Sequence, residues 1–326
     1  MKAIVHDRYG APEVLHVEDV AQPVPRDREI LVKIHAGTVN RTDGHARDGE
    51  RGYPLAARMA GRLAFGLRAP RRRILGSEFA GEVAAAGAGA TRFAIGDRVF
   101  GTTGLAFGCH AEFVCIRETG RVAHIPEGLT YEEAAPICDG ALSAISCLQP
   151  AGLGGGKTIL IYGASGAIGS AAVQLAARHF GAEVTAVCAT KSLELMKKLG
   201  AHNVLDYTKE DFTQNGEQYS VVFDAVGKHS FSKSRDSIKP GGCFLFVDGF
   251  GNVPRSVWTR WVGDKRVVAP AFTMYNQKGV YFLAQLVKAG EYKPVIDRVY
   301  PMTEVVEAAR YVDTQQKTGN VVLAVA

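Results

Sequence analysis

An apolar run, a glycine-rich turn and the start of a helical pattern follow one another at residues 158–180, an order that suits phosphate binding. A turn without Cβ atoms lets backbone N–H groups approach a pyrophosphate, and the positive end of the following helix stabilises the anion. The strict Gly-x-Gly-x-x-Gly pattern is altered, because Ala164 holds its first glycine position. The segment predicts a dinucleotide site, with a chance glycine-rich turn as the alternative. The residues expected to bind the pyrophosphate are Gly163, Ser165, Gly166, Ala167 and Ile168.

The end of the next apolar run, at residues 183–188, indicates which dinucleotide is bound. An NAD site usually has an Asp or Glu there for the ribose 2′-hydroxyl. This chain instead reads Cys-Ala-Thr-Lys-Ser at residues 188–192, and hydroxyls with a lysine suit a 2′-phosphate. The sequence therefore favours NADP(H), with a solvated lysine at a helix start as the alternative reading of Lys191. We expect Thr190, Lys191 and Tyr207 around the 2′-phosphate, and Val226 and Gly227 beside the ribose or nicotinamide.

The composition is that of an ordinary globular protein long enough for two domains. The chain has 326 residues and a net charge of +5, which does not by itself imply nucleic acid or membrane binding. No run approaches 18 apolar residues, and the charged, strand-like beginning is unlike a signal peptide, so a cytoplasmic protein is expected. The six cysteines form no Cys-x-x-Cys pair and are expected to be reduced and packed.

Seven arginines and no acid occur within residues 51–73. Proline and glycine in this stretch predict a loop with at most one short helix. Two roles are left open for it: a flap that attracts anions, or a solvated surface loop. Nucleic acid binding is disfavoured, because Tyr53 and Phe65 are the stretch's only aromatics that a base could stack on.

The order of expected elements divides the chain into two parts and predicts an α/β fold. Short strands and turns without helical periodicity fill the first part, and strands alternating with helices in the second argue for a parallel sheet. Expected strands cover residues 1–7, 29–36, 82–86, 98–101, 158–162, 183–187, 203–206, 220–225, 243–247, 266–269 and 321–325. Expected helices cover residues 132–148, 169–180, 192–199, 279–289 and 302–313.

Several ordered motifs make the chain resemble the medium-chain dehydrogenase/reductase superfamily, and within it the zinc-free branch similar to quinone oxidoreductases. They include Leu-Gly-Ser-Glu-Phe-Ala-Gly at 75–81, Gly-Asp-Arg-Val-Phe-Gly at 96–101, Lys-Pro-Gly-Gly at 239–242 and Thr-Gly-Asn-Val-Val at 318–322. The resemblance implies a GroES-like β-rich catalytic domain at residues 1–125, completed by a return segment at 273–326. It implies a Rossmann domain with a doubly wound parallel sheet at residues 126–272.

The same resemblance argues against a metal site. Zinc alcohol dehydrogenases of this superfamily have a cysteine where Asn40 stands and a histidine where Ser77 stands. Zinc prefers thiolate, imidazole and carboxylate ligands, so no metal is expected here. The implied catalytic residues are Asn40, near the nicotinamide, and Asp43, as a proton relay or positioning group; a helix cap or an ion pair with a nearby arginine is the alternative for Asp43.

Other residues receive weaker assignments from the resemblance. Glu78 is expected to be a buried structural acid, and His110 is the one histidine considered as a general acid, although a structural role is favoured. Cys138 departs from the small residues that relatives usually carry. Lys317, Gly319 and Asn320 are expected to close over the nicotinamide end of the cofactor.

The leading functional hypothesis is an NADPH-dependent reductase of a quinone or an α,β-unsaturated carbonyl compound (an enone). The alternatives are a nucleotide-binding protein with little turnover and an NADP-dependent alcohol or aldehyde oxidoreductase. The expected partner is a small-molecule substrate, with no nucleic acid and no membrane. A homodimer is expected through residues 266–269, an edge strand that could pair across a two-fold axis.

Overall fold

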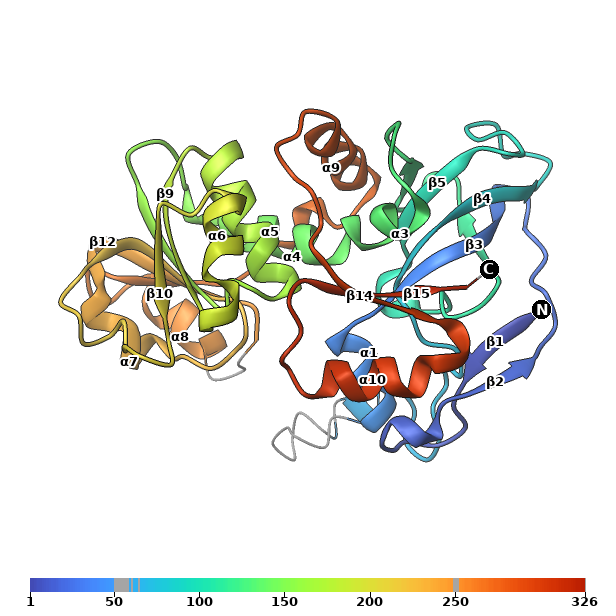
Figure 1. Ribbon diagram of the computed structural model, residues 1–326, viewed down its shortest axis with the longest axis horizontal. Coiled ribbons are helices and arrows are strands. Elements are labelled where there is room, and N and C mark those ends of the chain that lie inside the picture. Colours follow the sequence, from blue (N-terminus) through green and yellow to red (C-terminus); the bar gives the residue numbers. More distant parts are fainter. Residues whose placement is uncertain (50–58, 60, 64, 249–251, 326) are drawn as a thin grey trace. The chain divides into compact units, whose positions relative to one another are not determined.

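The computed structural model describes residues 1–49, 59, 61–63, 65–248 and 252–325 of the chain. It consists of two compact units, which are described separately below (Figure 1). Unit 1 comprises Met1–Asp139, Asn276–Ala284 and Ile296–Ala326, and unit 2 comprises Gly140–Tyr275 and Gln285–Val295. The chain therefore begins and ends in unit 1, and the residues of helix α9, Gln277–Lys288, divide between the two.

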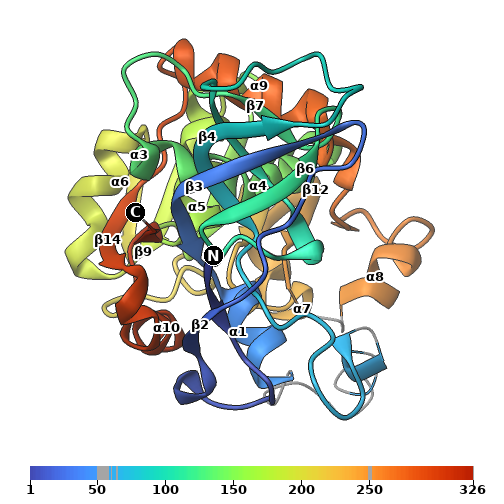
Figure 2. The same cartoon turned by 90° about the vertical axis from the view of Figure 1, so that its right-hand side faces the viewer.

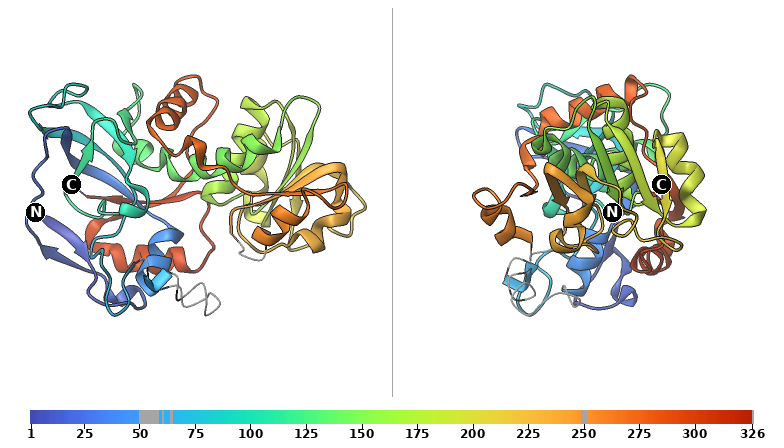
Figure 3. Two further views of the ribbon diagram at one scale, coloured as in Figure 1. Left: turned by 180° about the vertical axis from the view of Figure 1, so that it is seen from behind. Right: turned by 90° about the vertical axis from the view of Figure 1, so that its left-hand side faces the viewer.

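Unit 2 is built on a parallel sheet with the strand order β10-β9-β8-β11-β12-β13 (Figure 3). The order progresses outward from β8 in one direction and from β11 in the other, so the topological switch point lies between these two strands. In such sheets ligands bind at the carboxyl ends of the strands beside the switch point. The strands are β8 Thr158–Tyr162, β9 Glu183–Cys188, β10 Asn203–Asp206, β11 Tyr219–Asp224, β12 Ile238–Phe246 and β13 Arg266–Val268.

Helices connect most successive strands of unit 2, as expected for parallel pairing, and turns alone join β10 to β11. Beyond β8, helix α5 continues as a π-helical turn at Leu175–His179, and α6 ends at Gly200, whose φ of 110° suits glycine. The apolar core of the sheet includes Leu160, Val187, Val222 and Phe244, and Phe231 of α7 packs against it. The helices are α4 Asp139–Leu148, α5 Ala167–Gln174, α6 Leu193–Leu199, α7 Phe231–Ser234 and α8 Asn252–Trp258.

Unit 1 contains a mixed sheet, mostly antiparallel, with the order β14-β15-β3-β4-β5-β7, and β6 pairs with β3 (Figure 2). The C-terminal strand β15 pairs antiparallel with β3, so the last residues of the chain complete the sheet of the first domain. β1 and β2 form a separate hairpin. The strands are β1 Lys2–Val5, β2 His16–Asp19, β3 Glu29–Val39, β4 Glu78–Ala86, β5 Arg98–Thr102, β6 Phe113–Arg117, β7 Val122–His124, β14 Ile296–Pro301 and β15 Asn320–Ala324.

The two larger apolar cores among the described residues of unit 1 join its strands and helices. One contains Ile30, Phe79 and Val99 from β3, β4 and β5. The other packs helix α10, Val305–Asp313, with residues of β15 and with Ala46 of helix α1, Arg41–Asp48. Helices α1 and α10, far apart in sequence, lie side by side (Figure 1).

The structure confirms the predicted α/β class and corrects several elements. The helix expected at residues 132–148 is divided into α3, Tyr131–Ala134, and α4, because Pro136 has a non-helical ψ of 18°. Helices α1 and α8 and strand β14 were not expected. Helix α1 has almost no apolar residue, so its sequence carries no helical periodicity. Among the described residues, no helix is both long and apolar enough to cross a membrane.

Candidate active site

The glycine turn between β8 and α5 has the geometry that phosphate binding requires. Gly163 has a φ of 75°, and a Cβ on it would lie 2.5 Å from Cγ1 of Val226, the residue two positions after β11. A Cβ on Gly169 would lie 2.2 Å from the carbonyl oxygen of Gly163, so helix and strand approach closely only because this residue is glycine. The five residues predicted to bind the pyrophosphate are half-buried, whereas Ala164 between them is fully buried.

The turn after β11 is held by the carboxylate of Asp224. Its Oδ1 accepts the backbone N–H groups of Val226 at 3.0 Å and Gly227 at 2.9 Å, and its Oδ2 accepts that of His229 at 2.6 Å. Burial raises the pKa of Asp224, and these bonds act against that shift. Val226 and Gly227 therefore border the predicted nucleotide site, while their amides serve the turn itself.

The predicted 2′-phosphate residues gather at the carboxyl ends of β9 and β10. The backbone N–H of Tyr207 donates to the carbonyl of Cys188 at 3.2 Å, which brings Tyr207 beside the segment that carries Thr190 and Lys191. All three side chains are exposed. Two hydroxyl-bearing side chains and a lysine thus lie on one edge of unit 2.

Asp206 belongs to this edge and was missed by the sequence analysis. The Thr190 hydroxyl donates to its Oδ2, and Thr208 donates to its Oδ1 through both backbone and side chain. These hydrogen bonds, that from Thr190 first, lower the pKa of Asp206, so it carries a negative charge that Lys209 Nζ faces at 3.8 Å. β9 ends without an acid, as expected. The acid at the end of β10, Asp206, accepts the hydrogen bond that the Thr190 hydroxyl donates.

Unit 1 contains a second site, at the edge where β3 ends, β4 begins and β5 ends. The antiparallel pairing of these strands places Gly37 opposite Phe79, and Glu78 opposite Thr102. The kink between α3 and α4 adds the carboxyl group of the first residue of α4. We call the resulting group the unit 1 polar cluster; it consists of Thr38, Asn40, Ser77, Glu78, Thr102 and Asp139.

Glu78 is fully buried at the centre of the unit 1 polar cluster. Its Oε1 accepts the backbone N–H of Cys138 at 3.0 Å and that of Asp139 at 2.6 Å. Its Oε2 accepts the hydroxyl of Thr38 at 2.8 Å and Nδ2 of Asn40 at 3.0 Å. Burial, followed by the nearby charge of Asp139, raises the pKa of Glu78, so the two carboxyl groups together retain a proton above the ordinary carboxyl range.

Asp139 is half-buried and is the accessible member of the cluster, since the other five are buried. Its Oδ2 accepts the Ser77 hydroxyl, and its Oδ1 accepts the Thr102 hydroxyl at 3.0 Å. Burial raises the pKa of Asp139 against these two bonds, and the charge of Asp43 adds to the increase. The sequence analysis passed over Asp139, although it remarked on its neighbour Cys138.

The predicted catalytic pair, Asn40 and Asp43, lies at the start of α1, and the contact of either residue with a substrate or cofactor stays a prediction. Asn40 Nδ2 donates to Thr38 Oγ1 and to Glu78, both at 3.0 Å, with Asp139 Oδ2 at 3.5 Å. An amide nitrogen has two N–H protons, so Asn40 can donate to Thr38 and to Glu78 at the same time. Asp43 accepts the backbone N–H of Asn40 at 2.7 Å and that of Gly76 at 2.9 Å, and the first of these bonds is the helix cap that was the alternative reading of this residue.

His110 lies next to the cluster and is buried. Its Nε2 bonds to the carbonyl oxygen of Thr38 at 2.8 Å, so this nitrogen carries the proton, because a carbonyl only accepts. Its Nδ1 has no hydrogen-bond partner among the described residues. The ring packs on Gly76, where a Cβ would lie 2.3 Å from His110 Cδ2, and this contact supports the structural reading.

The three residues expected over the nicotinamide, Lys317, Gly319 and Asn320, belong to unit 1. Lys317 Nζ donates to the Gly319 carbonyl at 2.6 Å, and Asn320 is buried. Desolvation lowers the pKa of Lys317 to about 8, while the charge of Glu78 acts in the opposite direction. Their contact with a cofactor stays a prediction.

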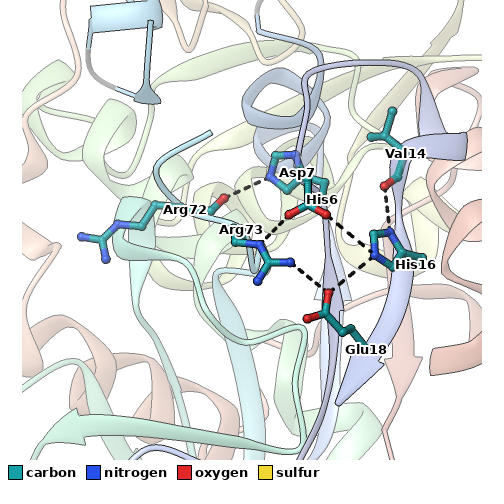
Figure 4. A network of polar contacts seen from close by, with 7 residues as sticks. All are labelled: His6, Asp7, Val14, His16, Glu18, Arg72 and Arg73. Carbon is teal, nitrogen blue, oxygen red and sulfur yellow. Dashed lines mark hydrogen bonds and ion pairs between the residues drawn. The ribbon is translucent and has the colours of Figure 1, made fainter. Parts of the chain in front are cut away.

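One group of possible metal ligands occurs among the described residues, on the β1–β2 hairpin of unit 1 (Figure 4). It consists of Asp7, His16 and Glu18, whose ligand atoms lie within 4.8 Å of one another. Arg73 already bonds to Asp7 at 2.6 Å and to Glu18 at 2.9 Å, so its guanidinium balances both carboxylates. The group is thus explained as an exposed ion-pair network.

The arginine stretch lies partly outside the described residues, which exclude Arg51 and Arg58. Arg73 takes part in the network above, and the guanidinium of Arg62 lies 3.9 Å from the ring centre of Tyr9. Two of the seven arginines therefore make structural contacts rather than presenting a charge to a substrate.

Comparison with known proteins matches much of the chain to dehydrogenase domains. A family model described as "Alcohol dehydrogenase GroES-like domain" matches residues 26–127, and one described as "Zinc-binding dehydrogenase" matches residues 199–323. The chain is 32% identical to a 2-methylene-furan-3-one reductase of Solanum lycopersicum, over 99% of this chain and 79% of the relative. It is 30% identical to a quinone oxidoreductase of Pseudomonas aeruginosa, over 99% of each chain.

The solved structure of a quinone oxidoreductase from Coxiella burnetii matches with a TM-score of 0.86 and 28% sequence identity. The match covers 100% of this chain and 99% of that one. A parallel sheet of the kind that binds nucleotides, together with a GroES-like domain, is typical of nicotinamide-dependent oxidoreductases. The chain belongs to the medium-chain dehydrogenase/reductase superfamily.

Proposed function

We propose that the protein is an NADPH-dependent reductase that transfers a hydride to a quinone or an enone without zinc. The observation that carries this proposal is the donor set of the unit 1 polar cluster. An amide at position 40 and a hydroxyl at position 77 stand where zinc-dependent relatives have a cysteine and a histidine, and both groups bond within the cluster. The names of the two relatives, a furanone reductase and a quinone oxidoreductase, support the same reaction class.

The cofactor, when bound, supplies the hydride, and this chain's residues hold and orient it. The half-buried turn at residues 163–168 and the first-turn amides of α5 suit the pyrophosphate. Tyr207 and Lys191 are exposed where a 2′-phosphate is expected, and they support NADPH over NADH. The charge of Asp206 opposes that preference, and Lys209 offsets part of it.

The acceptor's own chemistry replaces the Lewis acid. A quinone or an enone delocalises the charge that a hydride leaves on its oxygen, so orientation and hydrogen bonding are sufficient. An unactivated ketone or aldehyde lacks that delocalisation and needs stronger polarisation. The reaction class follows from what a cluster of hydroxyl, amide and carboxyl groups supplies.

The test is a panel of quinones, enones, enoyl thioesters, aldehydes and alcohols, run with NADPH and with NADH. We expect turnover of quinones or enones with NADPH, unchanged after prolonged dialysis against a chelator, and no stoichiometric zinc by elemental analysis. Activity that a chelator removes and zinc restores would overturn the zinc-free assignment. Binding of NADPH without turnover of any acceptor would favour the alternative, a nucleotide-binding protein with little catalysis.

A further inference from the structure

We propose that Asp139 is the proton donor of this reductase, the group that protonates the acceptor oxygen after hydride transfer. This inference rests on the proposed function and deepens it. Two carboxyl groups of the unit 1 polar cluster, Glu78 and Asp139, could carry a proton, and their hydrogen-bond partners differ in kind.

Glu78 is surrounded only by donors. Two of them are backbone N–H groups and one is the amide of Asn40, none of which can accept a proton. The fourth is Thr38, whose oxygen already accepts from Asn40, so its own proton points to Glu78. Four donors on the two oxygens leave no place for an acid proton, and they suit an ionised carboxylate.

The two closest side-chain partners of Asp139 are hydroxyl groups, and the donor-only amide of Asn40 lies farther away, with Nδ2 at 3.5 Å from Asp139 Oδ2. Ser77 and Thr102 contact one carboxyl oxygen each, and a hydroxyl accepts a hydrogen bond as readily as it donates one. The two hydroxyls therefore satisfy Asp139 both as a carboxylic acid and as a carboxylate. A proton shared by the two carboxyl groups consequently belongs on Asp139, and its loss leaves a carboxylate that both hydroxyls stabilise.

The charges around Asp139 favour its neutral form. Glu78 of β4 and Asp43 of α1 are acidic, and both disfavour a second negative charge. Arg121, before β7, is the cation that acts in the opposite direction, and its guanidinium also bonds to the Thr102 and Thr103 carbonyls. Lys317 interacts with Glu78, and the neighbouring thiols of Cys109 and Cys138 stay protonated because burial raises their pKa.

The proposed step balances. Hydride transfer gives the acceptor two electrons and leaves an enolate or a hydroquinone anion. The O–H bond of Asp139 breaks, a new O–H bond forms on the acceptor oxygen, and Asp139 becomes a carboxylate. An enol product then tautomerises to the ketone, and Asp139, which is half-buried, regains a proton from water.

The test compares Asp139→Asn with the parent enzyme on two acceptors of similar size. An enone leaves a basic enolate that needs a proton, whereas a nitroalkene leaves a nitronate that is stable without one. We expect the variant to lower kcat for the enone by about a hundredfold, the lower end of what general acid catalysis supplies, and kcat for the nitroalkene by less than about threefold. The decline of the parent's kcat toward high pH should disappear in the variant.

Controls separate the proton from the fold and from the proposed function. Ser77→Ala retains the carboxyl group and should lower the enone rate less than Asp139→Asn does, with unchanged NADPH affinity in both variants. Equal losses on the two acceptors, with the parent's pH profile retained, would overturn the inference and leave the reductase assignment standing. If the parent reduces no acceptor, the proposed function fails, and infrared spectroscopy still decides whether Asp139 is protonated: a carboxylic acid band lost in Asp139→Asn supports it, and no such band refutes it.

Discussion

Glu78 and Asp139 carry the same chemical group 61 positions apart in sequence, yet their hydrogen-bond partners give them different roles. Sequence reasoning identified Glu78 as a buried acid, because it lies in a strand motif of its family. It missed Asp139, because this residue fell inside the helix expected at residues 132–148, where a single acid carries no special signal. Only the pairing of β3, β4 and β5 brings hydroxyl groups to that carboxyl, and this pairing is a tertiary property.

The two raised pKa values predict a pH dependence of stability. The pair of Glu78 and Asp139 retains a proton in the folded protein, so the folded protein binds more protons than the unfolded chain from the unfolded carboxyl pKa values, about 4, up to the raised pKa of the pair. The free energy of unfolding should therefore be highest below that window and fall as the pH rises through it. Urea denaturation at closely spaced pH values measures the slope, and Asp139→Asn should reduce it. If the free energy of unfolding of Asp139→Asn depended on pH as steeply as that of the parent, the two carboxyl groups would not share a proton.

The side chain of Lys191 predicts the choice between the two cofactors. Lys191→Ala should raise the Michaelis constant for NADPH by about tenfold or more, because a charge-assisted hydrogen bond is worth about 1.5–3 kcal/mol. The constant for NADH should barely change. Lys209→Ala is the matched control, since Lys209 faces Asp206 on the same edge. Equal effects of Lys191→Ala on both cofactors would remove Lys191 from the phosphate site.

At the scale of elements, the close approach of helix α5 to the turn after β8 requires glycine at position 169, and a glycine-to-alanine substitution tests this requirement. A Cβ on Gly169 meets the Gly163 carbonyl at 2.2 Å, whereas a Cβ on Gly166 lies 3.6 Å from it, an ordinary contact. Gly169→Ala should therefore force the helix from the strand, lower the melting temperature and weaken NADPH binding. Gly166→Ala should leave the melting temperature within a few degrees, and differential scanning calorimetry compares the two. Similar melting temperatures would mean that the close approach is not required.

The strands of unit 2 were predicted well because each is a buried apolar run between turn residues. β8 and β10 match the expected bounds, β9 and β13 differ by one residue at one end, and β11 is shifted by one residue at both ends. β12 begins five residues earlier than expected, at Ile238, because a register irregularity carries Pro240 and two glycines into the strand. Composition alone does not predict such a bulge.

The edge strand β13 also differs from the simple expectation. The backbone N–H of Val267 donates to the hydroxyl of Thr259 at 2.9 Å, and both residues are buried. That donor is therefore not available to the strand of a second subunit. A homodimer through this edge stays a prediction, and it would have to use other groups of the strand.

At the scale of the whole molecule, the chain completes unit 1 only with its last segment. The family resemblance predicted this return, but local patterns did not show which contacts secure it. In the structure β15 pairs with β3, and α10 packs with residues from the first fifty positions. These contacts join residues more than 250 positions apart, so no local sequence pattern encodes them.

The ion pair between Arg47 and Asp313 joins α1 to α10 and tests this closure. Arg47 Nη2 bonds to Asp313 at 2.6 Å, with side-chain exposures of 4% and 39%, so the arginine is the partner that cannot regain water. Asp313→Ala should lower the free energy of unfolding by about 2 kcal/mol, because it leaves the buried Arg47 without its ion-pair partner and with a bond to the Gly10 carbonyl. The loss should be smaller than for a fully buried pair, because Asp313 is partly exposed.

Arg47→Met on its own removes the buried cation and leaves a carboxylate that water reaches, so it should cost less than Asp313→Ala. The double variant Arg47→Met/Asp313→Ala should be more stable than Asp313→Ala alone, because a methionine packs beside Ala46 without an unpaired charge. Urea denaturation of the four proteins forms the double-mutant cycle. If the double variant loses as much as the two single variants added together, the pair does not couple the helices, and the apolar packing of α10 alone closes unit 1.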